Sequence, residues 1–99
     1  MNMASSTIKK LPDSLLIKGK LNDTNDLDNV KDVGLYNWDT SVPSNSPENR
    51  QWSVLQVVKT SVVVKQIVFF GNNQIYMREY AGSPLVWSSW YKFTGTIVS

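Results

Sequence analysis

The segment from 66 to 93 constrains the fold more than any other part of this chain. It contains two apolar runs joined by Gly71-Asn72-Asn73, then a Gly-Ser-Pro turn, and then a run that carries two tryptophans. Glycine and asparagine accept the positive φ angles of tight hairpin turns, and β-branched and aromatic residues suit a half-buried pleated surface. The segment therefore predicts a three-stranded antiparallel β-meander, and the rest of the chain must pair with it or lead into it.

Alternation of side chains along the expected strands indicates how the sheet is built. Strands are expected at 35–38, 51–59, 62–70, 74–80 and 85–93. Both faces of the 51–59 strand are largely apolar, which places that strand in the centre of the sheet. Since one short helix cannot cover two apolar faces of a thin sheet, another element of the chain or another subunit must cover the remainder.

Residues 1–22 are predicted to form a neck or lead-in segment before a domain at 23–99. Pro12 and Gly19 argue against one continuous helix in the lead-in segment. A short strand at Leu15-Leu16-Ile17 would have little to pair with inside the chain. We therefore expect this segment to pack against a neighbouring subunit.

One short helix of one to two turns is expected at the start of the domain. Leu27 and Val30 are spaced to share a face, and Asp23 or Asn25 can cap the first turn. Gly34 is placed to end the helix as a C′ residue in the left-handed conformation. The predicted fold is thus mainly β, a small α+β domain with one N-terminal helix.

Composition excludes most catalytic chemistry. The chain has no cysteine and no histidine, which removes thiol and imidazole nucleophiles, bases and metal ligands. A calcium loop counted from Asp23 has Asp28 where glycine is needed and Gly34 where a bidentate glutamate is needed. The only glutamates are Glu48 and Glu79. We expect no enzyme activity, no cofactor and no metal site.

Charge and hydropathy also bear on partners. The net charge is only +2, without a basic stripe, so nucleic-acid binding is not expected. The longest apolar run, Ile67-Val68-Phe69-Phe70, is far shorter than a membrane-spanning helix, and the N-terminus lacks a signal-peptide core.

The loop at 39–51 contains the strongest candidate for ligand binding, the part from 39 to 50. It is rich in proline, serine and asparagine, and its polar side chains offer the donors and acceptors that polyhydroxylated ligands use. The tryptophans on either side of the loop are expected to form a stacking wall. The alternative is an ordinary solvated loop. The candidate saccharide-binding residues are Trp38, Asn45, Glu48, Asn49, Arg50 and Trp52.

Five motifs in order resemble a known family. They are Asp26-Leu27-Asp28-Asn29-Val30, Gly34-Leu35-Tyr36, Gln66-Ile67, Ile75-Tyr76-Met77-Arg78, and Trp87-Ser88-Ser89-Trp90 with Lys92-Phe93. Together, over residues 24–94, they resemble the pyocin-knob domain of bacteriophage tail fibres, receptor-binding proteins and R-type pyocins. The motif residues assigned to structure are Gly34, Tyr36, Arg78, Trp87 and Trp90. The N-terminal 22 residues have no counterpart in that domain.

Two of these motifs also admit a role in binding. Trp87 and Trp90 are three residues apart, so along a regular strand they would face opposite sides, either plugging two core layers or stacking on a sugar. Arg78 can pair with an acidic neighbour inside the fold or grip an anionic glycan. The acidic neighbours considered for Arg78 are Asp26, Asp28 and Glu79.

The resemblance implies a trimer-forming phage tail or baseplate protein, located in the virion and extracellular when it acts. Its expected partners are two further copies of the chain, other tail or baseplate proteins and a host cell-surface saccharide. Two alternatives remain open. One is a purely structural spacer or assembly knob without receptor contact, and the other is a carbohydrate-binding module of a secreted bacterial protein.

Overall fold

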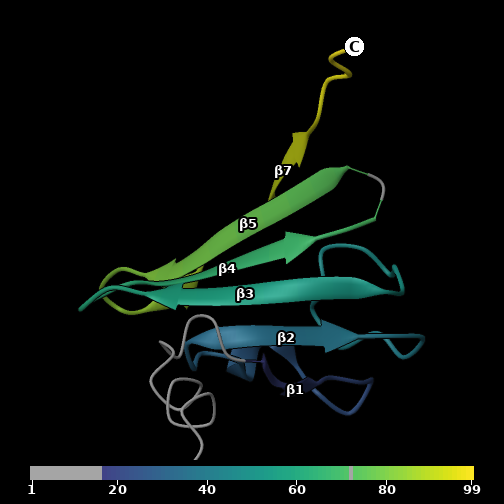
Figure 1. Ribbon diagram of the computed structural model, residues 1–99. Coiled ribbons are helices and arrows are strands. Elements are labelled where there is room, and N and C mark those ends of the chain that lie inside the picture. Colours follow the sequence, from purple (N-terminus) through teal and green to yellow (C-terminus); the bar gives the residue numbers. More distant parts are fainter. Residues whose placement is uncertain (1–16, 72) are drawn as a thin grey trace, which may run out of the picture.

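The computed structural model describes residues 17–71 and 73–99, which form one mixed β-sheet (Figure 1). The sheet order is β1-β2-β3-β4-β5-β6, and β7 also pairs with β5. The strands are β1 (Ile17–Lys20), β2 (Gly34–Trp38), β3 (Ser53–Lys59), β4 (Val64–Phe69), β5 (Gln74–Ala81), β6 (Val86–Trp87) and β7 (Tyr91–Thr94). The prediction of a mainly β fold is confirmed. No helix within the described ranges has the length and apolar character of a membrane span.

The strands from β2 to β6 follow one another as antiparallel neighbours. Strand β3 pairs with β2 on one side and β4 on the other, so its predicted central position is confirmed. Strand β4 begins at Val64 rather than at Val62. The Thr60 hydroxyl accepts the N–H groups of Val62 and Val63 at 3.3 and 3.0 Å, which keeps these residues in the turn.

The expected N-terminal helix is wrong in type and in both boundaries. Among the described residues, helical structure is limited to η2 (Leu27–Asn29), a single 3₁₀ turn. Asp26, rather than Asp23 or Asn25, is the N-cap and accepts the N–H of Asp28 at 2.8 Å. The chain becomes extended again at Val30, with φ −96° and ψ 90°.

Gly34 has a different role from the helix cap predicted for it. It is the first residue of β2, is buried, and has a φ of +151°, a conformation that favours glycine. It pairs with Val57 of β3. Gly34 is therefore the first residue of a strand that begins five residues after the end of η2.

The chain before residue 23 is in part integral to the sheet. Strand β1 pairs with β2 in parallel, and the N–H of Leu21 donates to Asn37 O at 2.7 Å. Leu21 itself is buried in the core. The expectation that a strand ending at Ile17 would lack a partner is wrong, and the fold extends at least from Ile17. Residues 1–16 of the predicted neck lie outside the described residues.

The last predicted strand is divided by a β-bulge. Tyr80 pairs with Trp87 and Met77 pairs with Tyr91, so two residues of β5 oppose three residues of the returning chain. The extra residue reverses the alternation. Trp87 and Trp90 therefore lie on the same face, and the prediction that they face opposite sides is wrong.

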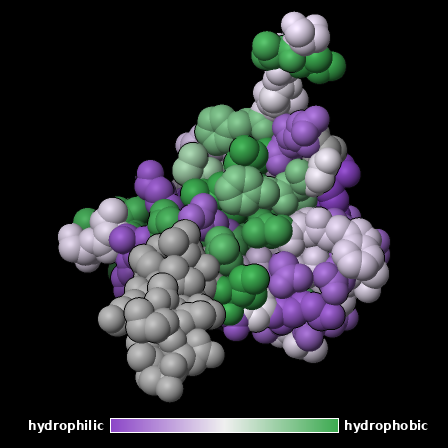
Figure 2. All heavy atoms as spheres, viewed as in Figure 1, coloured by the Kyte–Doolittle hydropathy of each residue, from purple (hydrophilic) through white to green (hydrophobic). Residues whose placement is uncertain are grey.

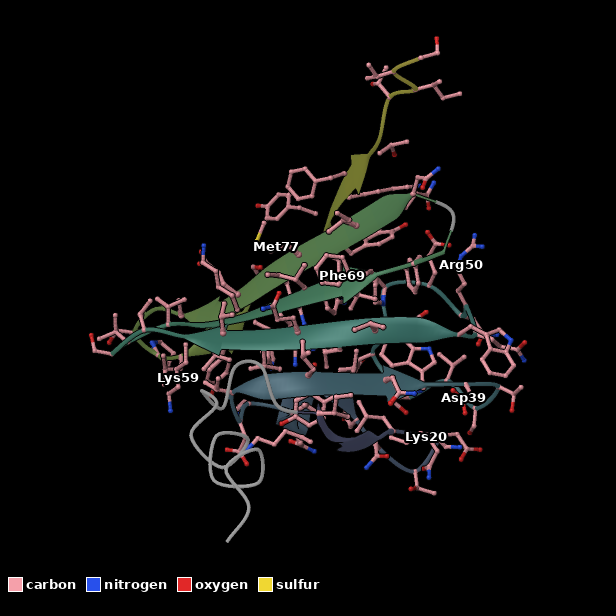
Figure 3. The ribbon with its side chains drawn as sticks, viewed as in Figure 1. Lys20, Asp39, Arg50, Lys59, Phe69 and Met77 are labelled. Carbon is pink, nitrogen blue, oxygen red and sulfur yellow. The ribbon has the colours of Figure 1, made fainter. Side chains whose placement is uncertain are left out.

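The two faces of the sheet differ in what covers them. One face packs under the segments 21–33 and 39–52, and we call it the covered face. The buried apolar residues of its core are Leu21, Leu27, Trp38, Leu55, Val57, Val64, Val68, Phe70 and Tyr76. The opposite face, here called the open face, carries Phe69 and Met77, and hydrophobic side chains gather over β3, β4 and β5 there (Figures 2 and 3).

Candidate functional site

The 39–51 loop is held in shape by side chains that reach it from the sheet. The buried indole of Trp38 donates to Arg50 O at 2.8 Å, and the indole of Trp90 donates to Asn45 O at 3.1 Å. The hydroxyl of Tyr76, on β5, hydrogen-bonds to a carboxylate oxygen of Glu48. Two of these donors come from strands and Trp90 lies between β6 and β7, so the loop conformation is set by the sheet and its connections and not by the loop alone.

A second set of contacts ties the loop to the segment before η2. The N–H of Leu27 donates to Ser44 O at 3.0 Å, and the N–H of Ser44 donates to Asn25 O at 2.9 Å. Asn45 has a φ of +63° and donates its side-chain amide to Asp26 Oδ1 at 2.7 Å. These contacts bring the 23–27 turn beside the loop, although they are well separated in the sequence.

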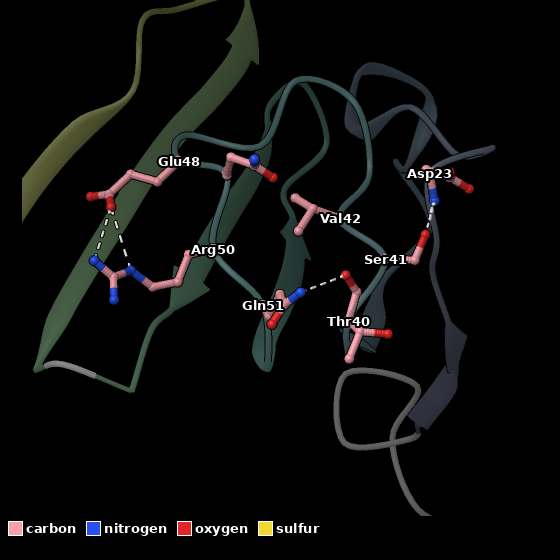
Figure 4. A pocket seen from close by; sticks show the side chains of 8 residues that line it. Asp23, Thr40, Ser41, Val42, Glu48, Arg50 and Gln51 are labelled. Atoms are coloured by element: carbon pink, nitrogen blue, oxygen red, sulfur yellow. Dashed lines mark hydrogen bonds and ion pairs between the residues drawn. The ribbon is translucent and has the colours of Figure 1, made fainter.

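The loop and this turn together border an open polar hollow of about 770 Å³ (Figure 4). The N–H of Asp23 donates to Ser41 Oγ at 2.9 Å, which joins two of its walls. The side-chain amide of Gln51 donates to Thr40 O at 3.1 Å on another side. The lining residues are Asp23, Thr40, Ser41, Val42, Glu48, Asn49, Arg50 and Gln51.

Two charged groups of the hollow, Glu48 and Arg50, are paired with each other. Arg50 contacts Glu48 Oε1 through Nε at 3.4 Å and Nη2 at 3.3 Å. The hydrogen bond from Tyr76, and then the contacts with Arg50, hold the pKa of Glu48 below its usual 4.5. The hollow thus presents an oriented carboxylate and guanidinium beside the uncharged polar groups of Asn49 and Ser41.

The structure brings together three of the six predicted site residues and separates the others. Glu48, Asn49 and Arg50 line the hollow. Trp38 is wholly buried, which removes it as a stacking surface for a ligand. Asn45 is engaged with Asp26 and Trp90 instead of lining the hollow.

Trp52 remains accessible but stands beside the hollow. Its side chain is 65% exposed, it follows the lining residue Gln51, and its φ is +57°. The N–H of Trp52 donates to Asp39 O at 2.8 Å, which closes the base of the loop. Asp39 in turn pairs with Lys20 of β1 at 3.0 Å.

The sequence did not single out Asp23, Thr40, Ser41, Val42 and Gln51 as site residues. Thr40 and Ser41 belong to a polar cluster within the predicted loop, and that composition was the available signal. Asp23 offered no such signal, because its position depends on the pairing of Asp26 with Ser44.

The structural motif residues gather around Arg78 on the covered face. The guanidinium lies 4.1 Å from the ring centroid of Trp87 and 4.5 Å from that of Trp90. Its Nη2 forms an ion pair with Asp28 Oδ1 at 2.9 Å, and its Nε donates to Gln66 Oε1 at 2.9 Å. Among the three acidic candidates, the ion-pair partner of Arg78 is therefore Asp28. Arg78 is only 6% exposed, and this burial excludes contact with a glycan at the surface.

The remaining motif residues are also engaged in the fold. Trp87 donates its indole N–H to Asp28 O at 3.1 Å. Tyr36 is half-buried and donates its hydroxyl to Asp32 O at 2.7 Å. Burial, and then the charge of Asp32, raise the pKa of Tyr36.

Comparison with family models, with curated proteins and with solved structures finds no match to this chain. Within the described ranges, no three Asp or Glu side chains cluster as a metal site would require. The site therefore has to be interpreted from its own geometry.

The contact between Glu48 and Tyr76 predicts that the stability of the fold decreases at both acidic and alkaline pH. The pKa of Glu48 is lowered, so its contribution is complete above the usual value of 4.5 and is lost as the pH falls through the folded-state pKa. The pKa of Tyr76 is raised above 10.0, chiefly by the bond to Glu48, so its contribution is lost as the pH rises through that raised value. We expect Tyr76→Phe to weaken both dependences in urea titrations at a series of pH values.

Asp26 adds to the acid side of the same profile. Hydrogen bonds from the Asn45 amide and then from the Asp28 N–H lower the pKa of Asp26 below 3.8, so this contribution is also lost on acidification. Asn45→Ala is expected to reduce it while leaving the alkaline side unchanged. Identical pH profiles for wild type, Tyr76→Phe and Asn45→Ala would contradict these assignments.

Proposed function

We propose that this chain is an attachment module of a bacteriophage tail fibre or baseplate, of the pyocin-knob type, and that it binds a cell-surface saccharide. In this proposal the module acts in the virion as a homotrimer, next to other tail proteins. The observation that carries the proposal is the polar hollow at the 39–51 loop. Its walls come from three separate parts of the chain and are held by a hydrogen bond between two of them and by one from Trp38 of the sheet.

The chemistry of the hollow suits a polyhydroxylated ligand. Sugar hydroxyl groups both donate and accept, and the side chains of Asn49, Ser41 and Arg50 offer both kinds of partner. A preformed site loses little conformational freedom on binding, which favours affinity for a small ligand. The exposed indole of Trp52 adds an apolar ring next to the hollow, of the kind that packs on the face of a sugar.

The second candidate function is a structural knob of the fibre without receptor contact. The open face favours it, because a sheet with one uncovered apolar face is suited to assembly with other protein surfaces. Under this alternative the hollow is an ordinary surface feature of a braced loop. The two functions are separated by whether the hollow binds saccharide.

Saccharide binding is tested with a glycan array, followed by calorimetry on the saccharides it identifies. Asn49 is exposed and no hydrogen bond to another described residue holds its side chain, so Asn49→Ala removes a ligand contact without disturbing the loop. We expect a roughly three- to tenfold weaker Kd, the equivalent of one hydrogen bond. Asn29→Ala, which changes another exposed asparagine away from the hollow, is expected to bind as wild type does. Absence of saccharide binding by the wild type, or equal binding by Asn49→Ala, would support the structural knob.

A further inference from the structure

The open face carries apolar side chains aligned across four strands. Antiparallel register places Val54, Phe69, Ile75 and Phe93 in one row. A second row, one pleat further along, consists of Gln56, Ile67, Met77 and Tyr91. Side chains in register on one face contact one another across strands, so the two rows form a continuous surface.

This surface is larger than a sheet facing water normally presents. Phe69, Tyr91 and Phe93 are 38%, 63% and 50% exposed. With roughly 200 Å² for each aromatic side chain, these three residues alone expose about 300 Å². Val54 and Ile75 of the first row are a further 42% and 37% exposed. The total reaches the largest apolar patch expected of a monomer, and antiparallel sheets usually place polar residues on a solvated face.

We infer that the open face is the surface through which copies of this chain associate with one another. The charge of the face favours a second copy as its occupant. A third row places Lys65 beside Glu79, 3.9 Å apart, next to Val58 of β3. Lys65 and Glu79 together give the edge of the open face no net charge, so the open faces of two copies do not repel each other. Lys65 of one copy can then approach Glu79 of the other. An anionic partner such as nucleic acid or an acidic membrane finds no excess of positive charge on these rows.

The dimensions of the face agree with association of this kind. Four strands about 4.8 Å apart, with three rows about 6.8 Å apart, cover roughly 20 by 20 Å, or about 400 Å² of flat area per copy. Because side chains project from the sheet, the accessible area is larger than the flat area. The total that two copies bury on association therefore reaches the lower range of specific interfaces, about 1,000 Å². Apolar sheet faces pack at about 10 Å with interdigitated side chains, which the two aromatic-rich rows allow. We expect association that depends on protein concentration.

The inference goes beyond the proposed function, because two open faces packed together join two copies, whereas the proposed homotrimer needs a contact among three. It does not depend on saccharide binding, because the hollow lies among the loops that cover the opposite face. The two can therefore fail separately. A chain that associates through the open face but binds no saccharide would contradict only the saccharide proposal.

The test uses the full chain and the variants Phe69→Glu and Phe93→Glu, measured by sedimentation and native mass spectrometry over a range of concentrations. We expect the wild type to be heavier than one chain and both variants to be single chains, with far-ultraviolet circular dichroism unchanged. Val62→Glu is the matched control, since Val62 is 73% exposed in the β3–β4 turn, outside the rows. It should associate as the wild type does. A wild type that stays monomeric at every concentration, or glutamate variants that associate normally, would overturn the inference.

Cross-linking provides a second readout that does not depend on the stability of the glutamate variants. The chain contains no cysteine, so a single introduced thiol is unique. Phe69→Cys is expected to give covalently linked chains with a short bismaleimide, and Val62→Cys is expected to give few. Equal cross-linking at the two positions would contradict association through the open face.

Discussion

Arg78→Ala is expected to lower the free energy of unfolding by about 3 kcal/mol, because it removes a large buried side chain and leaves a buried hydrogen-bond partner unpaired. The substitution removes the ion pair with Asp28 and the donor to Gln66, both at 2.9 Å. It also leaves a space between the rings of Trp87 and Trp90, which contact the guanidinium from two sides. Because Arg78 is 6% exposed, solvent cannot replace these contacts without entering the core.

Urea denaturation at neutral pH measures this effect, with Lys65→Ala as control. Lys65 pairs with Glu79 at 3.9 Å, and both side chains are about half exposed, at 44% and 48%. Loss of such a surface pair should cost less than about 1 kcal/mol. Equal and small effects of the two substitutions would show that Arg78 does not stabilise the fold, and would return it to the set of candidate ligand contacts.

Gln66→Leu is expected to lower the free energy of unfolding by about 3 kcal/mol, although the two side chains are similar in size. The wholly buried amide of Gln66 donates to Leu27 O at 2.7 Å and to Val30 O at 2.8 Å. Its oxygen accepts the Nε of Arg78. Leucine would leave Val30 O and the Nε of Arg78 without these partners, while Leu27 O keeps the N–H of Val30 at 3.1 Å. Each buried group left unpaired costs about 1–3 kcal/mol.

The consequence of Gln66→Leu should extend beyond global stability. Since Gln66 holds the carbonyls at both ends of η2, its loss should increase amide hydrogen exchange in residues 25–30 more than in β3. Gln56→Leu is the matched control, because Gln56 lies on the open face of β3 and is only half-buried. It should change stability by less than about 0.5 kcal/mol. Uniform exchange in Gln66→Leu would contradict a specific role in holding η2.

Much of the sheet was predictable because local chemistry determines it. Gln66, Val68 and Phe70 lie on the face opposite Ile67 and Phe69, as strand alternation requires. The turn residues also behave as their chemistry indicates, since Asn73 has a φ of +63° and Gly82 a φ of +101°. Such features depend on neighbouring residues in the chain and are therefore accessible from sequence.

The errors have a common cause in contacts between distant segments. The helix expected around Leu27 is reduced to one 3₁₀ turn. This is because the side chains of Gln66 and Trp87 donate hydrogen bonds to backbone carbonyls of this segment. The accepting carbonyls are those of Leu27, Asp28 and Val30. These bonds join residues 36 to 59 positions apart. Helical spacing within a short segment carries no information about such partners.

The candidate site was predictable only in part. Its loop was identified from composition, and Glu48, Asn49 and Arg50 do line the hollow. The role of Trp38 was not accessible from sequence, since a tryptophan beside a polar loop can stack on a ligand or point into the core. Its indole satisfies the carbonyl of Arg50 from within the core, and burial of so large an apolar side chain there is favourable.

The sequence by itself determined where most of the strands and turns lie and which neighbouring side chains share a face, because pleat and turn geometry follow from local residue types. Tertiary structure alone decided three further features: the bulge that turns Trp87 and Trp90 toward Arg78, the parallel pairing of β1, and the meeting of Asp23 with the 39–51 loop. Each of these depends on packing and hydrogen bonding between segments that are far apart in the chain. A single extra residue in one strand is enough to reverse the face of every side chain that follows.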